Sequence, residues 1–481
     1  MKLINPLIIL RILSTILFLE SFAFLSCLPV CFIYKESSDP FLWSALITAS
    51  LSLACYFASK NAPFYKVSSR EGFISVSLSW LVFTALGSLP YIFSGSIHSF
   101  IDAFFESSSG FTTTGSTIIP DVESLAFSIL YWRSFTHWIG GLGIIVLVII
   151  IMPVFGISGN QLFFHESSLK EKIHPKAKGV GFRLLYVYLL LTISEIILLN
   201  LGDMNLFDSI CHTYGTVATG GFSTKNTSIS GFSSYTQYII SLYMFLSGVS
   251  FIVYYFMVKL NFKKVKRNEE LWFYIGTTVI CGTIATCILL AKTTKPFELA
   301  FREGFFQIIS ILTTTGYVTT DYLNWPQAGL VLIFVLLFAG ASSGSTTGGI
   351  KMVRHLIVLK NIRNVTQKLI HPNIVTQIKL NNKPLAESAN ISIISFVVVY
   401  IFIFLTGTVL VVITGIDPVT AASGVGTALG NTGPGLGAVG PMFTYAGMPA
   451  ITKLIFSFLM FIGRLEIYTI LVLFTRSFWK Q

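Results

Sequence analysis

Four short segments, rich in glycine, serine and threonine, have the residue types that bind a bare cation through backbone oxygens. Each segment contains a Thr-Gly pair, and the four glycines are 105, 96 and 117 residues apart. Glycine adopts positive φ at no steric cost, so the chain can turn its carbonyl oxygens toward a common axis. Rings of such oxygens replace the hydration shell of a potassium-sized ion. The candidate cation-binding residues are therefore Thr113, Thr114, Gly115, Ala218, Thr219, Gly220, Thr314, Thr315, Gly316, Asn431, Thr432 and Gly433.

A short, partly apolar stretch with an acidic residue at its start precedes each of these glycines. The four acids are Asp102, Asp208, Glu303 and Asp417. A stretch of about a dozen residues is too short to cross a bilayer and indicates a re-entrant half-helix. The C-terminal end of each half-helix would direct a partial negative charge toward a cation. One Thr-Gly pair is an ordinary helix-ending turn, but four at near-equal spacing predict four quarters of one pore.

The composition indicates the environment in which these segments lie. Of the 481 residues, 53% are hydrophobic and 11% are charged, and the mean hydropathy is +0.75. Soluble domains have about 25% charged residues, so soluble enzymes, secreted disulfide-bonded domains and disordered chains are excluded. A transmembrane helix needs roughly 20 apolar residues. We predict ten such spans, near residues 7–33, 41–58, 73–93, 125–155, 184–201, 236–258, 271–291, 328–350, 391–414 and 451–475.

The net charge of +11 does not indicate nucleic-acid binding, because the basic residues are distributed by membrane side. With a cytoplasmic N-terminus, one set of loops holds most of the 32 Lys and Arg residues but only 6 of the 21 acids. This is the positive-inside pattern, so both termini are expected in the cytoplasm. The bases concentrate at 166–183, 259–270 and 351–387. Some of these bases can attract anionic membrane lipid, and the remainder offer a platform for a cytosolic partner.

A run of small and polar residues, GASSGSTTGG (340–349), interrupts the eighth span and is followed by a lysine. Glycine, serine and threonine at this density are expected to unwind a helix. The alternative is a small-residue face for close helix packing, which membrane proteins also use. The residues of interest are Gly340, Gly344, Ser345, Thr346, Gly348, Gly349 and Lys351.

Arg464 lies about midway along the last apolar span, with Glu466 two residues further on. An ionisable group at that depth indicates a functional role, because its burial is costly unless it is paired. The alternative is a structural ion pair, with Glu195 of the fifth span or Glu20 of the first. Residues 464 and 466 point to different faces of a helix, so they are poor partners for each other.

Two stretches of the sequence resemble nucleotide-binding motifs, but the residues around them do not fit those motifs. GLGAVG (435–440) fits a dinucleotide fingerprint but has no preceding strand or following helix. Residues 344–351 depart from a phosphate-binding loop, because Ile350 separates Gly349 from the lysine. The six cysteines mostly lie in apolar spans at no metal-ligand spacing, which indicates small buried hydrophobes. We therefore expect no enzyme activity and no nucleotide bound by this chain.

The four segments resemble the pore loops of the Trk/Ktr/HKT superfamily of potassium transporters. The likeness extends over nearly the whole chain and includes HWIGGLGI (137–144), GASSGSTTGGIK (340–351) and GRLE (463–466). It is strongest to the Trk-type membrane subunit of bacteria, which has two extra helices before the first repeat. The resemblance implies an all-α polytopic membrane protein with four fused helix–pore-loop–helix repeats around one pseudo-fourfold pore. The implied divisions are a two-helix extension at 1–66 and repeats at 67–180, 181–268, 269–385 and 386–481.

The same resemblance implies how the protein works. K⁺ is the transported ion, and glycine rather than serine at position 115 favours potassium over sodium. The 340–349 segment would obstruct the pore below the filter, and Arg464 would be an electrostatic barrier in the conduction path. The family implies a homodimer in the bacterial cytoplasmic (inner) membrane, controlled by a cytosolic nucleotide-binding regulatory ring of the TrkA type. Channel-like conduction is favoured by the scarcity of carboxylates in the spans, and symport of potassium with H⁺ or Na⁺ is the alternative.

Overall fold

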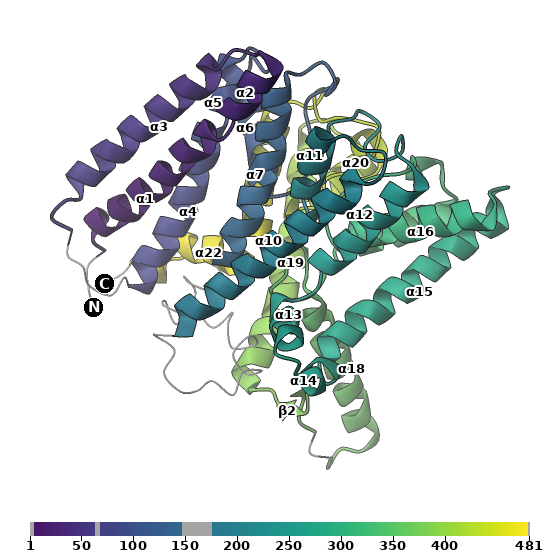
Figure 1. Ribbon diagram of the computed structural model, residues 1–481. Coiled ribbons are helices and arrows are strands. Elements are labelled where there is room, and N and C mark those ends of the chain that lie inside the picture. Colours follow the sequence, from purple (N-terminus) through teal and green to yellow (C-terminus); the bar gives the residue numbers. More distant parts are fainter. Residues whose placement is uncertain (1–3, 63–67, 147–175, 375, 480–481) are drawn as a thin grey trace.

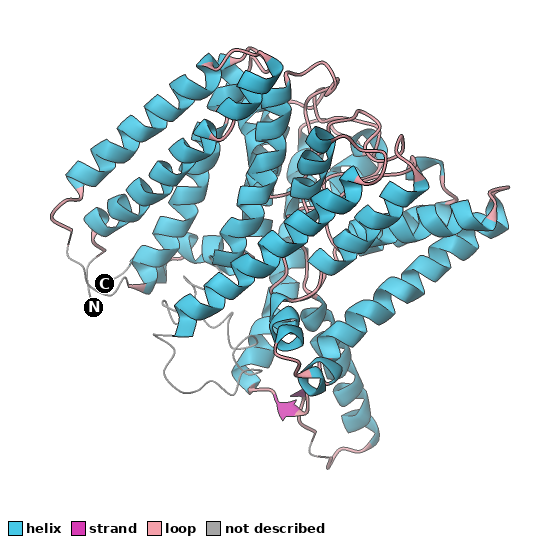
Figure 2. Cartoon of the chain, viewed as in Figure 1, coloured by secondary structure: helices cyan, strands magenta, loops and turns pink. Residues whose placement is uncertain are grey.

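The computed structural model describes residues 4–62, 68–146, 176–374 and 376–479, which form a predominantly helical membrane protein (Figure 1). The strands in this described part form one small antiparallel hairpin, β1 (Lys379–Leu380) and β2 (Lys383–Pro384). The hairpin lies at one end of the molecule, near α14 and α18, in the third of the predicted basic regions (Figure 2).

Three helices form an extension before the first of four repeated units: α1 (Pro6–Leu25), α2 (Leu28–Tyr34) and α3 (Asp39–Ala58). Helix α1 packs against both α3 and α4. Asn5 caps α1 and also donates its backbone N–H to Glu71 of α4 at 3.0 Å. The extension is therefore attached to the first helix of the following unit along its length.

A fixed order of elements then recurs four times: a long helix, a short helix, an irregular segment and another apolar helix. The second and fourth units continue into further short helices. The helices in order are α4 (Ser69–Gly87), α5 (Leu89–Phe93), α6 (Phe100–Phe111), α7 (Phe127–Val146), α10 (Lys176–Asn200), α11 (Leu206–Val217), α12 (Ser234–Ser247), α13 (Phe251–Val258), α14 (Phe262–Lys266), α15 (Glu269–Lys292), α16 (Phe297–Leu312), α17 (Gln327–Leu336), α18 (Met352–Ile370), α19 (Glu387–Ile413), α20 (Pro418–Gly430), α21 (Ala450–Arg464), α22 (Ile467–Leu471) and α23 (Arg476–Trp479). Short 3₁₀ turns lie at Tyr322–Asn324, Gly437–Val439 and Val472–Phe474.

The short helices α6, α11, α16 and α20 are the predicted half-helices, and a side-chain cap fixes where α11 and α20 begin. The side chain of Asn205 caps α11, and that of Asp417 caps α20 by accepting from Thr420 N–H at 3.0 Å. Such caps satisfy backbone donors that a helix start leaves unpaired. One prediction was wrong in detail: Glu303 lies in the middle of α16, whose first-turn acid is Glu298.

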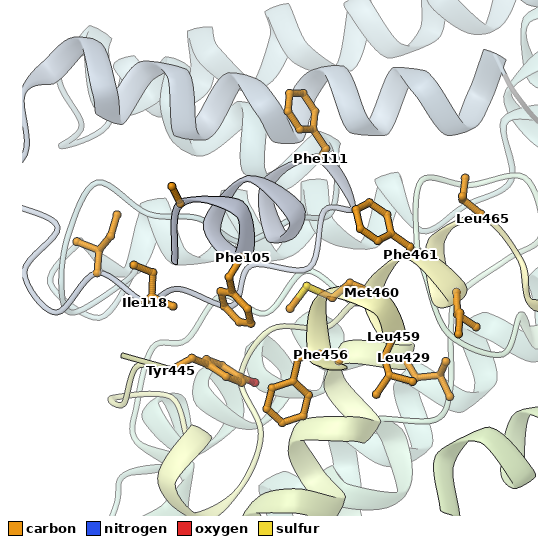
Figure 3. Packing of buried hydrophobic residues seen from close by; sticks show 14 of the residues in the cluster. Phe105, Phe111, Ile118, Leu429, Tyr445, Phe456, Leu459, Met460, Phe461 and Leu465 are labelled. Carbon is orange, nitrogen blue, oxygen red and sulfur yellow. The ribbon is translucent and has the colours of Figure 1, made fainter. Parts of the chain in front are cut away.

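Aromatic packing holds the last of these units against the first. Phe456, Met460 and Phe461 of α21 lie in the same buried cluster as Phe105 and Phe111 of α6 (Figure 3). Helix α21 contacts both α6 and α20, so the end of the chain packs against its first half-helix. An ion pair between Lys453 and Asp102, 2.6 Å long, reinforces this closure.

Several predicted spans are not continuous helices. The sixth is bent by 92° between α12 and α13, and the last by 113° between α21 and the helical stretch Ile467–Phe474 that begins with α22. The eighth ends as a helix at Leu336, so the predicted unwinding of its small-residue run is confirmed. By length and composition, the described residues contain five membrane-crossing helices, or seven if each bent pair is one span. Residues 147–155 of the fourth span and 166–175 of the first basic loop lie outside the described residues.

Candidate functional site

The four glycine-containing segments share one unusual backbone conformation. Each begins with a non-glycine residue at positive φ, which side chains rarely adopt. Two residues later comes a glycine that is also at positive φ. The first residues are Thr113, Thr219, Thr314 and Asn431 at 53°, 56°, 53° and 54°, and the glycines are Gly115, Gly221, Gly316 and Gly433 at 86°, 82°, 81° and 95°.

This conformation corrects the alignment of the second segment by one residue. Gly221, and not Gly220, has the place of Gly115 in the first segment. Ala218, which the sequence alignment included, is the C-cap of α11 and keeps a right-handed conformation. The cause is the pair of consecutive glycines after Thr219, which lets a Thr-Gly match fall one position early.

The four segments contact one another in a closed cycle. A methyl group added to each glycine would overlap a carbonyl oxygen of the next segment, and the last segment meets the first again. The overlaps are Gly115 with Gly220 O, Gly221 with Thr315 O, Gly316 with Thr432 O, and Gly433 with Thr114 O. No side chain fits at these four positions, so backbone carbonyls approach one another around a common centre.

Tyrosine hydroxyl groups connect the segments at two of their four boundaries. Tyr317 donates to Phe222 O at 3.1 Å and Tyr322 to Gly435 O at 2.7 Å, whereas Tyr445 donates to Gly433 O at 3.1 Å within its own unit. At the boundary between the fourth segment and the first, the Ser116 hydroxyl group donates to Gly433 O at 3.2 Å. All three tyrosines are at most 2% exposed. Sequence reasoning missed them, since a tyrosine in an apolar protein gives no signal of its hydrogen-bond partner.

Side chains with negative charge do not form a cation site here. Among the described residues, no group of three or more His, Cys, Asp and Glu side chains could hold a metal ion. The segments instead offer carbonyl oxygens and buried threonine hydroxyl groups, with Thr114, Thr219, Thr315 and Thr432 all 0% exposed. A cation at their centre would depend on neutral oxygen ligands.

The small-residue segment after α17 lies directly against two of the four segments. The Thr346 hydroxyl group donates to Val217 O at 3.1 Å, and Gly348 N–H donates to the Thr314 hydroxyl oxygen at 2.8 Å. The segment also folds on itself, because a Cβ at Gly340 would overlap Gly348 O. The predicted residues 340–349 are thus placed together against the second and third segments.

Glu270, at the start of α15, connects this small-residue segment to the first turn of α18. Its Oε1 atom accepts the backbone N–H of Ser343 at 2.5 Å and that of Val353 at 3.2 Å. Lys351 donates its ammonium group to the Thr347 carbonyl. Sequence reasoning missed Glu270, although an acid beside a basic loop and at the start of an apolar span was a visible signal.

Arg464 is the last residue of α21 and stands at the sharp bend, so its predicted mid-helix position was wrong. Its side chain is 2% exposed and donates to Thr346 O at 2.6 Å and Gly140 O at 3.0 Å. The alternative of an ion pair is overturned, because neither Glu20 nor Glu195 bonds to it. Glu466 instead pairs with Arg354 at 2.6 Å.

These features define a polytopic membrane transport protein and not an enzyme. The family model TrkH, described as a cation transport protein, matches residues 40–481. The chain therefore belongs to the TrkH family of cation transport proteins.

Known relatives and one solved structure are similar over almost the full length. The Trk system potassium uptake protein TrkH of Escherichia coli (strain K12) is 38% identical over 423 residues, 86% of this chain and 87% of the relative. The protein of the same name from Vibrio parahaemolyticus is 34% identical over 484 residues, 98% of this chain and 99% of the relative. The crystal structure of the potassium transporter TrkH from Vibrio parahaemolyticus matches with a TM-score of 0.88 and 32% identity, covering 98% of this chain and 99% of that one.

The corrected alignment yields a stability prediction. Gly221→Ala should destabilise the protein by about 2 kcal/mol or more, because it adds positive-φ strain and a collision with Thr315 O. Gly276→Ala is the matched control, since a Cβ there meets nothing within 4 Å. Thermal unfolding in detergent measures the difference, and equal melting temperatures for the two variants would contradict the alignment.

Proposed function

We propose that this chain takes up potassium ions across the bacterial cytoplasmic membrane, through a passage lined by the carbonyl oxygens of its four segments. The closed cycle of glycine–carbonyl contacts is the observation that carries the proposal. Relatives at 34–38% identity are named potassium uptake proteins, which supports potassium as the substrate. The proposed filter residues are those of the sequence alignment, except that the second segment contributes Thr219, Gly220 and Gly221, and Ala218 is left out.

Two features suit the passage to a potassium ion. The half-helices α6, α11, α16 and α20 end directly at the four segments, so their C-terminal partial charges favour a cation. Neutral carbonyl oxygens replace the water of a large, weakly hydrated ion at lower cost than that of a small one. In this proposal each of the four fused repeats, at 67–180, 181–268, 269–385 and 386–481, contributes one quarter of the filter.

The gate in this proposal consists of the 340–349 segment and Arg464. The segment is tied to the second and third filter segments through Thr346 and Gly348. Within the described residues, Arg464 donates to carbonyl oxygens and pairs with no carboxylate. We infer a closed state in which the segment blocks the path and the guanidinium group repels the cation. Opening breaks the contacts at Thr346.

Assembly and regulation complete the proposal. The chain acts as a homodimer, in contact with membrane lipid, with both termini in the cytoplasm and no nucleic-acid partner. A separate cytosolic nucleotide-binding ring of the TrkA type docks on the basic loops and moves the gate. The exposed bases of α14 and the hairpin at 379–384, next to α15, support that docking face.

Channel-like conduction is the favoured mechanism, and potassium symport with H⁺ or Na⁺ is the alternative. One observation favours the alternative: Glu20 and Glu195 are both 0% exposed and form no ion pair within the described residues. A coupled proton would need such a carboxyl group. Single-channel current steps in planar bilayers would establish conduction, and flux that requires a proton or sodium gradient would establish symport.

Substitution at the filter tests the passage itself. Gly316→Ser should lower potassium over sodium discrimination about tenfold, or ~1.4 kcal/mol, because a Cβ there would overlap Thr432 O and displace that carbonyl. Flux of both ions into proteoliposomes measures the ratio, with Gly447→Ser, which meets nothing within 4 Å, as the control. Unchanged selectivity at Gly115, Gly221, Gly316 and Gly433 alike would remove the filter assignment.

Removal of the charge at the gate tests the barrier. Arg464→Ala should raise the rate of potassium uptake by up to about thirtyfold with selectivity retained. Two unit charges about 8 Å apart repel by ~2 kcal/mol at an effective dielectric constant near 20, and each 1.4 kcal/mol is a factor of about ten. Arg464→Lys, which keeps the charge, should retain most of the barrier. If folded Arg464→Ala protein shows the original rate, the arginine has a structural role only.

Charge reversal tests the docking face. The fourfold variant Lys263→Glu, Lys264→Glu, Lys266→Glu and Arg267→Glu, all at exposed positions, should abolish co-purification with the regulatory ring. Lys292→Glu, exposed at the opposite end of α15, is the control and should leave the complex intact. If nucleotide regulated the flux through this chain alone, the proposal that a separate ring binds the nucleotide would be contradicted.

A further inference from the structure

The boundary between the first and second segments contains a charged contact instead of a tyrosine. Glu106 of α6 and Arg133 of α7 form an ion pair with Nε and Oε1 2.7 Å apart, and their side chains are 0% and 3% exposed. A buried pair is costly unless further hydrogen bonds satisfy both partners. The additional bonds of this pair go directly to the two filter segments.

Glu106 holds the far end of the first segment. The Thr117 hydroxyl group lies 3.0 and 3.1 Å from the two carboxylate oxygens, and Ile118 N–H donates to Oε2 at 2.9 Å. Thr117 and Ile118 follow Gly115 closely in the chain. The carboxylate therefore fixes the backbone immediately beyond the filter glycine.

Arg133 holds the corresponding part of the second segment. Its Nη1 atom donates to Ser223 O at 2.9 Å, and its guanidinium carbon lies 3.6 Å from the centroid of the Phe222 ring. Phe222 directly follows Gly221. Glu106 and Arg133 together thus join the two segments through one charge-assisted contact, which is shorter and stronger than a neutral hydrogen bond.

His137, one turn further along α7, connects the same two units. Phe222 N–H donates to its Nε2 atom at 3.2 Å, and its Nδ1 atom lies 2.7 Å from Gly110 O of α6. The neutral imidazole with its proton on Nδ1 satisfies both contacts. Helix α7 therefore presents two side chains on one face, and each contacts both α6 and the second segment.

We propose that Glu106 and Arg133 are positioning residues that set potassium over sodium discrimination by fixing the separation of the first and second filter segments. This inference rests on the proposed function. The Gly115–Gly220 contact lies between the two held backbones, so a looser link lets these carbonyls move toward a smaller ion. Neither residue touches the ion in this arrangement.

The test compares ion selectivity among matched variants in proteoliposomes. Glu106→Gln should lower the potassium to sodium flux ratio about tenfold, or ~1.4 kcal/mol. Arg133→Lys keeps the charge but cannot reach both Glu106 and Ser223 O, and Thr117→Val removes one donor without changing size. Both should lower the ratio by a smaller factor. Glu298→Gln, which breaks the partly exposed pair with Arg302, is the control and should leave the ratio unchanged.

Melting temperature and monodispersity, measured on the same samples, separate selectivity from folding. If Glu106→Gln is not recovered in folded form, Arg133→Lys and Thr117→Val decide the outcome. An unchanged ratio in the folded variants, while Gly316→Ser lowers it, would overturn this inference and leave the filter assignment standing. An unchanged ratio in Gly316→Ser as well would remove the filter assignment itself.

Discussion

Close packing of four glycines against four backbone carbonyls is the contact on which the rest of the structure depends. Each glycine meets the carbonyl oxygen of the next segment so closely that any side chain would overlap it. The centre of the molecule is therefore lined by irregular backbone, which a membrane tolerates only where protein or a water-filled path satisfies its polar groups. The surrounding helices have to provide that support.

The supporting groups differ from one boundary to the next although the four segments share a backbone conformation. Tyr317, Tyr322 and Ser116 supply neutral hydroxyl groups at three boundaries. Glu106 with Arg133 supplies an ion pair at the fourth. A chain with four unequal units can stiffen one boundary independently, which four identical subunits cannot do. The small-residue segment is held in the same manner, by side chains on neighbouring elements.

Two buried arginines show how the surroundings decide what a charge does. Arg133 faces Glu106 at 2.7 Å, so its charge is balanced and its remaining donor positions a backbone. Arg464 donates to the carbonyls of Thr346 and Gly140, and no carboxylate of the part of the chain that the structure describes pairs with it. In a low-dielectric interior an uncancelled charge acts strongly on a nearby cation. The same residue type therefore supports the filter in one place and, as we propose, the gate in the other.

The sequence by itself determined the membrane class, the four half-helices and the unwound segment at 340–349, because apolar runs, near-equal glycine spacing and helix-breaking residues are local signals. Only the tertiary structure decided the alignment at Gly221, since Thr219-Gly220-Gly221 matches the repeat equally well in two registers and φ alone separates them. The bend at Arg464 and the partners of Glu106, Glu270 and Glu466 likewise could not be predicted from the sequence. Each of these contacts joins residues from different helices, and their pairing depends on how those helices pack around the four segments.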